Sequence, residues 1–388
     1  MKTIKTTMAA ALLATVAVPA FALEEGKLTI WMGGDKGNEN LEQVVAQFTA
    51  DLGVEVSVEV ADPLTDKFQQ AAATGDGPDI VLWAHDRFGE WAAGGLISPV
   101  APSKSFQDGI LASGWDAVSA GGKIWGYPVS VEAIGLVYNT DLIDTPPATF
   151  EEIASMETPE GVAPILWDYN NTYFTMPMIM ANGGYAFKKV DGSYDGTDTG
   201  VNNEGAMIGG NTLKSLFDDG VLPQGVDYGV MDGAMANGEV AMVINGPWSW
   251  GGYEGAGRNI AVAPIPTVNG QISPAFLGVY SAAVNAASPN KDLAVELIEN
   301  YMLTDEGLAA WNANGNLGAL ADKSAGASQS DPKVAATIAN AATGIPMPSN
   351  PEMGAFWSAM GPALSNITSG AASVEDALND AAARILGE

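Results

Sequence analysis

Residues 27–82 alternate between strand and helix patterns, and this alternation restricts the fold more than any other feature of the chain. Apolar or alternating runs predict strands at 27–32, 54–60 and 80–82, and apolar spacing predicts a helix over 38–52. A second helix is predicted from Asp62-Pro63 to about Thr74, because proline is favoured in a first helical turn. The β-α-β-α-β order predicts an α/β fold with a parallel sheet and right-handed crossovers.

The segment after the third predicted strand carries the first candidate site. The apolar run Ile80 to Leu82 ends in Trp83, and the charged pair Asp86 and Arg87 follows shortly after. In open α/β sheets, ligands bind outside the carboxyl ends of the strands. An indole beside two charged groups suits a sugar, whose C–H faces lie on the ring while its hydroxyls bond to the charges. A core tryptophan followed by a solvated ion pair explains this segment, taken alone, about equally well.

Residues 1–22 have the pattern of an export signal. Lys2 and Lys5 precede an apolar core, and Ala20-Phe21-Ala22 is a cleavage site, so the mature chain is expected to begin at Leu23. The chain has 0 Cys, which excludes disulfides and a cysteine-linked lipid anchor at that site. An exported, unanchored protein stays with the cell only behind an outer membrane. We therefore expect a periplasmic location, with free secretion as the alternative.

The charge balance restricts the partners. Acidic residues number 46 and basic residues 16, which gives a net charge of −30. Such a field repels nucleic acid and anionic lipid, so neither is an expected partner. Adaptation to salt, where screening relieves the self-repulsion, is a hypothesis that this charge suggests. The length of 388 residues predicts two or three domains, or two lobes.

Signatures of catalysis and of cofactor binding are missing from the sequence. His85 is the only histidine, which excludes a metal site built from several histidines. No glycine-rich dinucleotide or phosphate-binding motif occurs, so we expect no cofactor and no metal. Asp35, Asp86 and Glu132 are candidates for a glycosidase carboxylate pair, but among 46 acidic residues such pairs carry little information. We expect a protein that is not an enzyme.

Several aromatic residues lie where a ligand could reach them. Trp83, Trp248 and Trp357 stand at or near the ends of predicted elements, with polar or glycine neighbours. Tyr173 lies in the polar and aromatic segment 170–177, which is predicted to be a loop, and Tyr228 follows an aspartate. Each of these aromatic residues, taken alone, is better explained as part of the hydrophobic core. Together, in a chain without a catalytic signature, they suggest stacking platforms for rings.

Longer segments carry a resemblance to a known family. They are residues 24–28, 34–37, 72–88, 183–188, 245–248, 285–291, 303–307 and 355–357. Over nearly the whole mature chain, the sequence closely resembles the periplasmic maltose/maltodextrin-binding proteins, the solute-binding components of ATP-driven (ABC) importers. The resemblance implies that maltose or a maltodextrin binds between two lobes. It also implies that the closed form docks on the membrane subunits of the importer, and such a transport role favours a monomer.

The resemblance also implies the architecture. The expected fold is the two-lobe periplasmic-binding-protein fold, with mixed, mostly parallel sheets, helices on both faces and a hinge between the lobes. The N-terminal lobe is expected to comprise 23–131 and 282–326, and the C-terminal lobe 135–277 and 332–388. The crossovers near 131–135, 277–282 and 326–332 would form the hinge.

Carried over position by position, the resemblance assigns ligand contacts to Asp35, Lys36, Trp83, Ala84, Asp86, Arg87, Glu132, Tyr173, Tyr228, Trp248 and Trp357. Some positions depart from the family pattern. Asn171 and Thr65 each replace a glutamate, Gly361 an arginine and Pro63 a lysine. These changes bear on affinity and chain-length preference more than on sugar class. The alternatives are a binder of another disaccharide, such as trehalose or sucrose, and an exported glycosidase.

Overall fold

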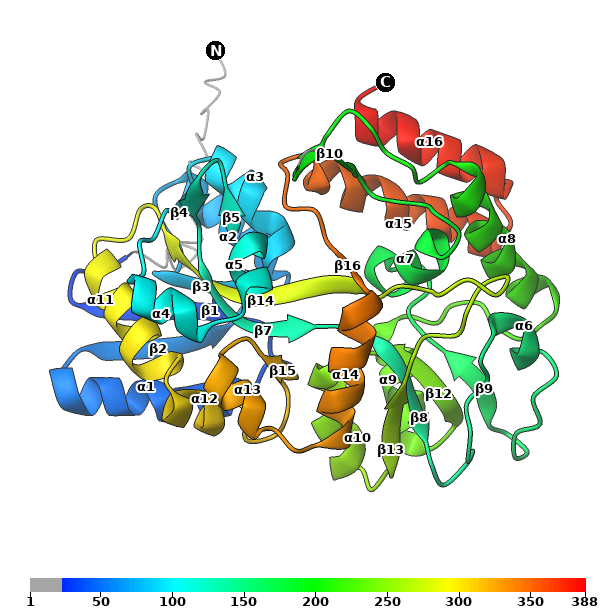
Figure 1. Cartoon of the computed structure of the whole chain (residues 1–388), viewed down its shortest axis with the longest axis horizontal. Coiled ribbons are helices and arrows are strands. Elements are labelled where there is room, and N and C mark those ends of the chain that lie inside the picture. Colours follow the sequence, from blue (N-terminus) through cyan, green and yellow to red (C-terminus); the bar gives the residue numbers. More distant parts are fainter. Residues whose placement is uncertain (1–22, 191) are drawn as a thin grey trace, which may run out of the picture.

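The computed structural model describes residues 23–190 and 192–388, so the predicted export signal at 1–22 lies outside the described residues. The described chain forms two α/β lobes joined by crossing segments (Figure 1). Within these residues, none of the helices combines the length and the apolarity needed to cross a bilayer.

The N-terminal lobe is built on a sheet with strand order β15-β7-β14-β3-β1-β2, in which β4 and β16 also pair with β14. Strands β1, β2 and β3 are parallel to one another, whereas β14 runs antiparallel to β3 and β7. The elements of this lobe are β1 (Lys27–Met32), α1 (Asn38–Leu52), β2 (Glu55–Val60), α2 (Leu64–Ala73), β3 (Ile80–Ala84), α3 (Phe88–Ala93), β4 (Ile97–Ser98), α4 (Lys104–Gly109), α5 (Ala112–Ala117), β5 (Ser119–Ala120), β6 (Lys123–Ile124), β7 (Tyr127–Glu132), β14 (Phe276–Asn285), α11 (Lys291–Leu297), α12 (Asp305–Trp311), β15 (Ala319–Leu320) and α13 (Lys323–Ser328).

The C-terminal lobe is built on a four-stranded sheet of order β13-β8-β12-β9. Its elements are β8 (Gly135–Asn139), α6 (Phe150–Ile153), β9 (Ala163–Leu166), α7 (Thr172–Met180), β10 (Lys188–Val190), β11 (Ser193–Asp195), α8 (Glu204–Asp218), α9 (Tyr228–Asn237), β12 (Val240–Asn245), α10 (Trp250–Gly255), β13 (Ile260–Ala263), α14 (Pro332–Thr343), β16 (Ile345–Pro346), α15 (Met353–Ser369) and α16 (Val374–Leu386). Figure 1 shows α8, α15 and α16 on the right, away from α1 and α11 on the left.

Two separate hydrophobic clusters support the division into lobes. One contains β1, β3 and the later part of β14, and the other contains β8, β12 and the start of β14. The chain crosses between them from β7 to β8, along β14 and from α13 to α14, near the centre of Figure 1. The lobe limits and hinge segments given above stay a prediction, and the two clusters are the observation that supports them.

The start of the N-terminal lobe explains where a ligand can bind. Helix α1 buries Leu41, Val44, Val45 and Phe48, whose spacing places them on one face against the sheet. Because β1 and β3 are parallel neighbours, the turns that follow them emerge at the same edge. Those turns carry Asp35, Lys36, Asp86 and Arg87, the charged residues of the sequence-predicted site other than Glu132.

The segment predicted as a polar loop at 170–177 is a helix instead, since α7 spans Thr172–Met180. The Asn171 side chain caps it by accepting a hydrogen bond from the Tyr173 amide at 3.1 Å. Within the helix, the Thr175 hydroxyl donates to the Tyr169 carbonyl and accepts from the Trp167 indole. Nearly every residue of α7 is buried, so tertiary packing outweighs the helix-breaking tendency of Pro177.

Candidate functional site

A cavity of about 740 Å³ lies between the lobes, a size typical of small-molecule sites. Both lobes contribute to its wall, which is formed by Gly33, Asp35, Lys36, Thr65, Asp66, Gln69, Trp83, Ala84, Asp86, Arg87, Glu90, Glu132, Asn171, Tyr173, Trp248, Tyr280, Met347, Gly354, Trp357 and Ser358. The sequence-predicted site residues are therefore brought together here, with one exception. Whether they contact a ligand stays a prediction.

The exception is Tyr228, which is not part of the described wall. Its ring packs behind the wall against Phe174, with the ring centroids 6.0 Å apart. Burial raises the pKa of its hydroxyl. Among the positions that depart from the family pattern, Thr65 and Asn171 line the cavity, whereas Pro63 and Gly361 lie outside its described wall.

A buried ion pair forms part of the cavity wall. Lys36, in the turn after β1, pairs with Glu132 at the end of β7, and both side chains are more than nine-tenths buried. The Lys36 ammonium also lies 4.1 Å from the centroid of the Trp248 ring and 5.2 Å from that of Tyr280. Burial raises the pKa of Glu132, although Lys36 acts in the opposite direction. The pair therefore fixes a cation against two aromatic faces.

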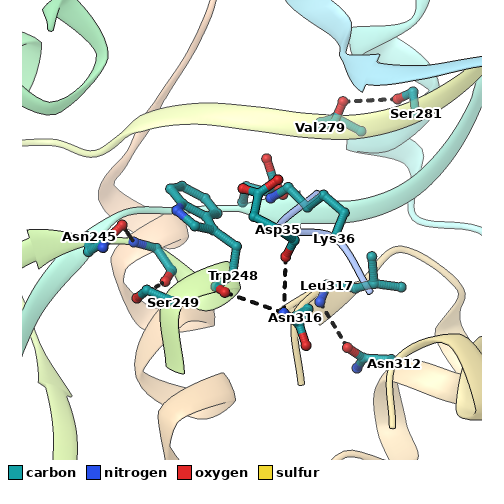
Figure 2. Close-up of polar contacts among 12 residues, drawn as sticks. Asp35, Lys36, Asn245, Trp248, Ser249, Val279, Ser281, Asn312, Asn316 and Leu317 are labelled. Carbon is teal, nitrogen blue, oxygen red and sulfur yellow. Dashed lines mark hydrogen bonds and ion pairs between the residues drawn. The ribbon is translucent and has the colours of Figure 1, made fainter. Parts of the chain in front are cut away.

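Trp248 is held in place by its own turn. The Asn245 side chain accepts a hydrogen bond from the Gly246 amide, and the Ser249 hydroxyl donates to the Gly246 carbonyl, both at 2.8 Å. A Cβ on Gly246 would lie 2.2 Å from the Trp248 ring, so only glycine allows this approach. Figure 2 shows the indole above this turn and beside Asp35 and Lys36.

Two tyrosines of the cavity wall carry hydroxyl groups that are free to bind a ligand. Tyr173 packs beside Trp248, with the ring centroids 6.2 Å apart. Among the described residues, the buried hydroxyls of Tyr173 and Tyr280 have no hydrogen-bond partner. Burial raises the pKa of both hydroxyls well above the ordinary value, so they remain protonated donors. A ligand with hydroxyl groups can satisfy them.

Asp86 connects the two lobes. It lies in the turn after β3 and is 3% exposed, and the Trp357 indole of α15 donates a hydrogen bond to its Oδ2 at 2.9 Å. The other carboxylate oxygen is buried without a partner among the described residues. Burial raises the pKa of Asp86 from 3.8 to about 7, although Arg87 and the Trp357 bond act in the opposite direction. This oxygen is a ready acceptor for a ligand hydroxyl.

The raised pKa of Asp86 predicts a pH-dependent stability difference from the Asp86→Asn variant. Between about pH 4 and pH 7, the folded wild type binds more protons at this group than the unfolded chain does, so its contribution to stability falls as pH rises. We expect the free energy of unfolding of the wild type, minus that of Asp86→Asn, to increase as the pH is lowered from 7 to 4. Urea denaturation measures this, and a difference that stays constant would contradict it.

The remaining charged residues of this wall are held by neighbours. The Arg87 guanidinium donates to Gln69 Oε1 at 3.1 Å and lies 2.9 Å from a carboxylate oxygen of Glu90. Gln69 in turn donates to the other carboxylate oxygen of Glu90 at 2.7 Å. This network joins α2 to α3 and fixes Arg87 in the cavity wall.

His85 has a structural position, which agrees with the absence of a catalytic signature around it. Its Nδ1 accepts from the Val279 amide at 3.0 Å, so its Nε2 donates to the Met347 carbonyl at 2.9 Å. Burial lowers its pKa to about 4, so the ring is neutral near pH 7. The histidine thereby connects the end of β3 to strand β14 and to the segment before α15.

Sequence reasoning missed several residues of this site. Gln69, Glu90, Tyr280 and Met347 line the cavity, and Asn316, outside its described wall, donates hydrogen bonds to the backbone carbonyls of two wall residues. Tyr280 could have been predicted as a site residue, because it lies beside Ser281 in a strand that pairs with the end of β3. The others have no local pattern that distinguishes them from surface or core residues.

Comparison with known proteins agrees with this geometry. The chain matches the bacterial extracellular solute-binding protein family over residues 34–309. It is 29% identical to the galactooligosaccharide-binding protein of Bacillus subtilis, over 93% of this chain and 89% of that protein. It is 26% identical to a maltooligosaccharide ABC transporter solute-binding lipoprotein of Streptococcus pneumoniae, over 92% and 88% of the two chains.

A maltodextrin-binding protein of Bacillus subtilis is 29% identical, over 79% of this chain and 76% of that protein. The family match covers well over half of the chain. The chain therefore belongs to the bacterial extracellular solute-binding protein family.

Proposed function

We propose that this protein binds maltose and maltodextrins in the interlobe cavity and delivers them to an ATP-driven membrane importer. One observation carries the proposal: Trp248 and Tyr173 line the cavity opposite the charged N-terminal wall, beside buried hydroxyl and carboxylate groups that have no partner among the described residues. Aromatic faces bind the apolar faces of sugar rings, and the unused polar groups bind the hydroxyls. The cavity is thus complementary to a neutral, hydroxyl-rich ring compound.

The names of the relatives narrow the sugar class. Two of the relatives above are named for maltooligosaccharide or maltodextrin, which supports an α-glucan. Another is named for galactooligosaccharides, which makes a galactose-containing oligosaccharide the second candidate. Trehalose and sucrose remain alternatives in the same cavity.

A tryptophan fluorescence screen tests the proposal. Trp248 and Trp357 both line the cavity, so a bound sugar should change the emission of the purified protein. We expect saturable changes with maltose and maltotriose, at lower concentrations than with trehalose, sucrose, cyclic dextrins or a galactooligosaccharide. A change with the galactooligosaccharide alone would assign the second candidate function, and no change with any sugar would reject sugar binding.

We also propose that the protein does not cleave its ligand. Glu132 is paired with Lys36, and Asp86 accepts from the Trp357 indole, so two of the three candidate carboxylates have a structural partner. Chromatography of maltotriose after long incubation with the protein should show no released glucose. Released glucose that disappears in the Glu132→Gln or Asp86→Asn variant would favour an exported glycosidase instead.

Delivery to an importer follows from closure of the two lobes around the ligand. We propose that the closed monomer acts in the periplasm, docks on the membrane subunits and binds no nucleic acid. Cell fractionation tests the location, and light scattering coupled to size-exclusion chromatography tests the oligomeric state. A stable dimer would contradict the proposed monomer, and a protein found only in the culture medium would contradict the proposed periplasmic location.

The departures from the family pattern give a prediction about affinity. The Asn171→Glu, Gly361→Arg double variant restores two charged groups beside the wall, and a Cβ at Gly361 would have only the Asn170 carbonyl nearby, at 3.7 Å. We expect it to bind maltose about three- to tenfold more tightly, because hydrogen bonds from charged groups are stronger. Titration calorimetry measures this, and an unchanged Kd would mean that the two positions do not affect maltose binding.

A further inference from the structure

We propose that Asn316 is a positioning residue that clasps the two lobes together and sets the spacing between Trp248 and the Asp35–Lys36 turn. It lies in the loop between α12 and β15, outside the cavity wall, and it is absent from the sequence-predicted site. The proposal rests on the sugar-binding function proposed above, because it concerns how the same cavity is held around a ligand.

The contacts of the Asn316 side chain reach both lobes. Its Nδ2 donates to the Asp35 carbonyl of the N-terminal lobe at 3.0 Å and to the Trp248 carbonyl of the C-terminal lobe at 3.3 Å. Figure 2 shows the amide between these two carbonyls. An amide nitrogen carries two protons, so it can satisfy both acceptors at once. Separating Trp248 from Asp35 must break at least one of the bonds.

The loop presents this amide in a fixed position. Asn312 Oδ1 accepts from the Leu317 amide at 2.9 Å, which closes the loop on itself. The Trp311 indole donates to the Lys36 carbonyl at 2.8 Å, which ties the same loop to the turn after β1. The loop is thus already bonded to the turn after β1 within the N-terminal lobe, and Asn316 adds a bond from the loop to Trp248 of the C-terminal lobe.

The backbones of the two lobes approach closely around this clasp. A Cβ on Gly318 would lie 2.5 Å from Pro247, the residue before Trp248. A Cβ on Gly251 would lie 3.3 Å from the Asn314 carbonyl. Gly318 and Gly251 thus allow the loop to lie close to the Trp248 turn. The hydrogen bonds of the Asn316 amide lie within this contact.

We expect the clasp to affect ligand binding, because the two residues that it joins are part of the cavity wall. Asp35 and Trp248 both line the cavity, and the Lys36 ammonium lies 4.1 Å from the Trp248 ring. Contacts that exist only between closed lobes increase the fraction of protein ready to hold a ligand. Removing them lowers the apparent affinity in proportion to the lost closed population.

The test compares Asn316→Asp and Asn316→Leu with the control Asn314→Asp. The first variant places a carboxylate against two carbonyl oxygens, and the second removes the donor without adding charge. Asn314 is exposed in the same loop, and its side chain has no hydrogen bond among the described residues, so its variant adds the same charge without touching the clasp. Each protein is first checked for its melting temperature.

Two readouts are measured. Titration with maltotriose gives the Kd, and fluorescence energy transfer between dyes on Glu42→Cys of α1 and Asp380→Cys of α16 reports lobe separation without ligand. The natural chain has 0 Cys, so the labels are site-specific. We expect both Asn316 variants to bind maltotriose about tenfold more weakly, because two neutral hydrogen bonds are lost. We also expect their transfer efficiency without ligand to be lower than that of the wild type. Asn314→Asp should match the wild type.

Unchanged Kd and unchanged transfer efficiency in both Asn316 variants would overturn the clasp, even if their melting temperatures fell. A wild type that binds no sugar would reject the proposed function instead. In that case the ligand-free transfer efficiencies still decide whether Asn316 holds the lobes together.

Discussion

Replacing Trp248 with alanine is expected to weaken maltotriose binding by about 30-fold or more. Trp248 is only 9% exposed and lines the cavity, and its ring contacts the Lys36 ammonium and packs beside the Tyr173 ring. Truncating a buried aromatic at the centre of a binding site costs about 2–4 kcal/mol, because stacking area and the surrounding packing are lost together.

Titration calorimetry of three variants separates stacking from general damage. Trp248→Phe keeps an aromatic face and should retain most of the affinity. Trp125→Ala removes a half-buried indole of the N-terminal lobe that is not part of the cavity wall, and it should leave the Kd unchanged. Wild-type affinity in a folded Trp248→Ala protein would show that the sugar does not stack there.

Replacing Lys36 with methionine is expected to destabilise the folded protein by about 3–5 kcal/mol at pH 7. The change leaves the Glu132 carboxylate buried without its partner, which is more costly than losing the attraction of the pair alone. Because burial already raises the pKa of Glu132, the variant can neutralise it by taking up a proton. The destabilisation should therefore become smaller as the pH is lowered.

A double-mutant cycle measures the coupling of this pair. Lys36→Met combined with Glu132→Gln removes both charges. We expect the free energy of unfolding of this double variant, measured in urea, to lie closer to the wild-type value than the value for Lys36→Met does. Additive losses in the two single variants would mean that the pair is not coupled in the folded protein.

Local periodicity predicted the start of the fold well. The helix predicted over 38–52 is α1, and the strand predicted over 27–32 is β1, because both patterns depend on neighbours in the sequence. The strand predicted at 54–60 begins one residue later, at Glu55. Strand β14 runs from Phe276 to Asn285 as it crosses between the lobes, and it pairs with β3 and β7, which are distant from it in the sequence.

Tertiary packing decided what the sequence could not predict. Asn171, Thr172 and Pro177 are typical of loops and predict one here, yet the buried side chains of α7 hold it as a helix. Asn316 has no distinguishing neighbours in the sequence, and its role depends on two carbonyls, one of them 281 residues away along the chain. Most of the site residues implied by the resemblance lie together in the cavity wall, and Asp86 and Trp357 among them connect the lobes, whereas Asn316 had no signal in the sequence.

The most direct test of the central claim is a crystal structure of the protein with maltotriose. The account predicts glucosyl rings in the interlobe cavity, stacked on Trp248, with a ligand hydroxyl on the free oxygen of Asp86. Maltotriose bound elsewhere, or an empty cavity at saturating maltotriose, would contradict it.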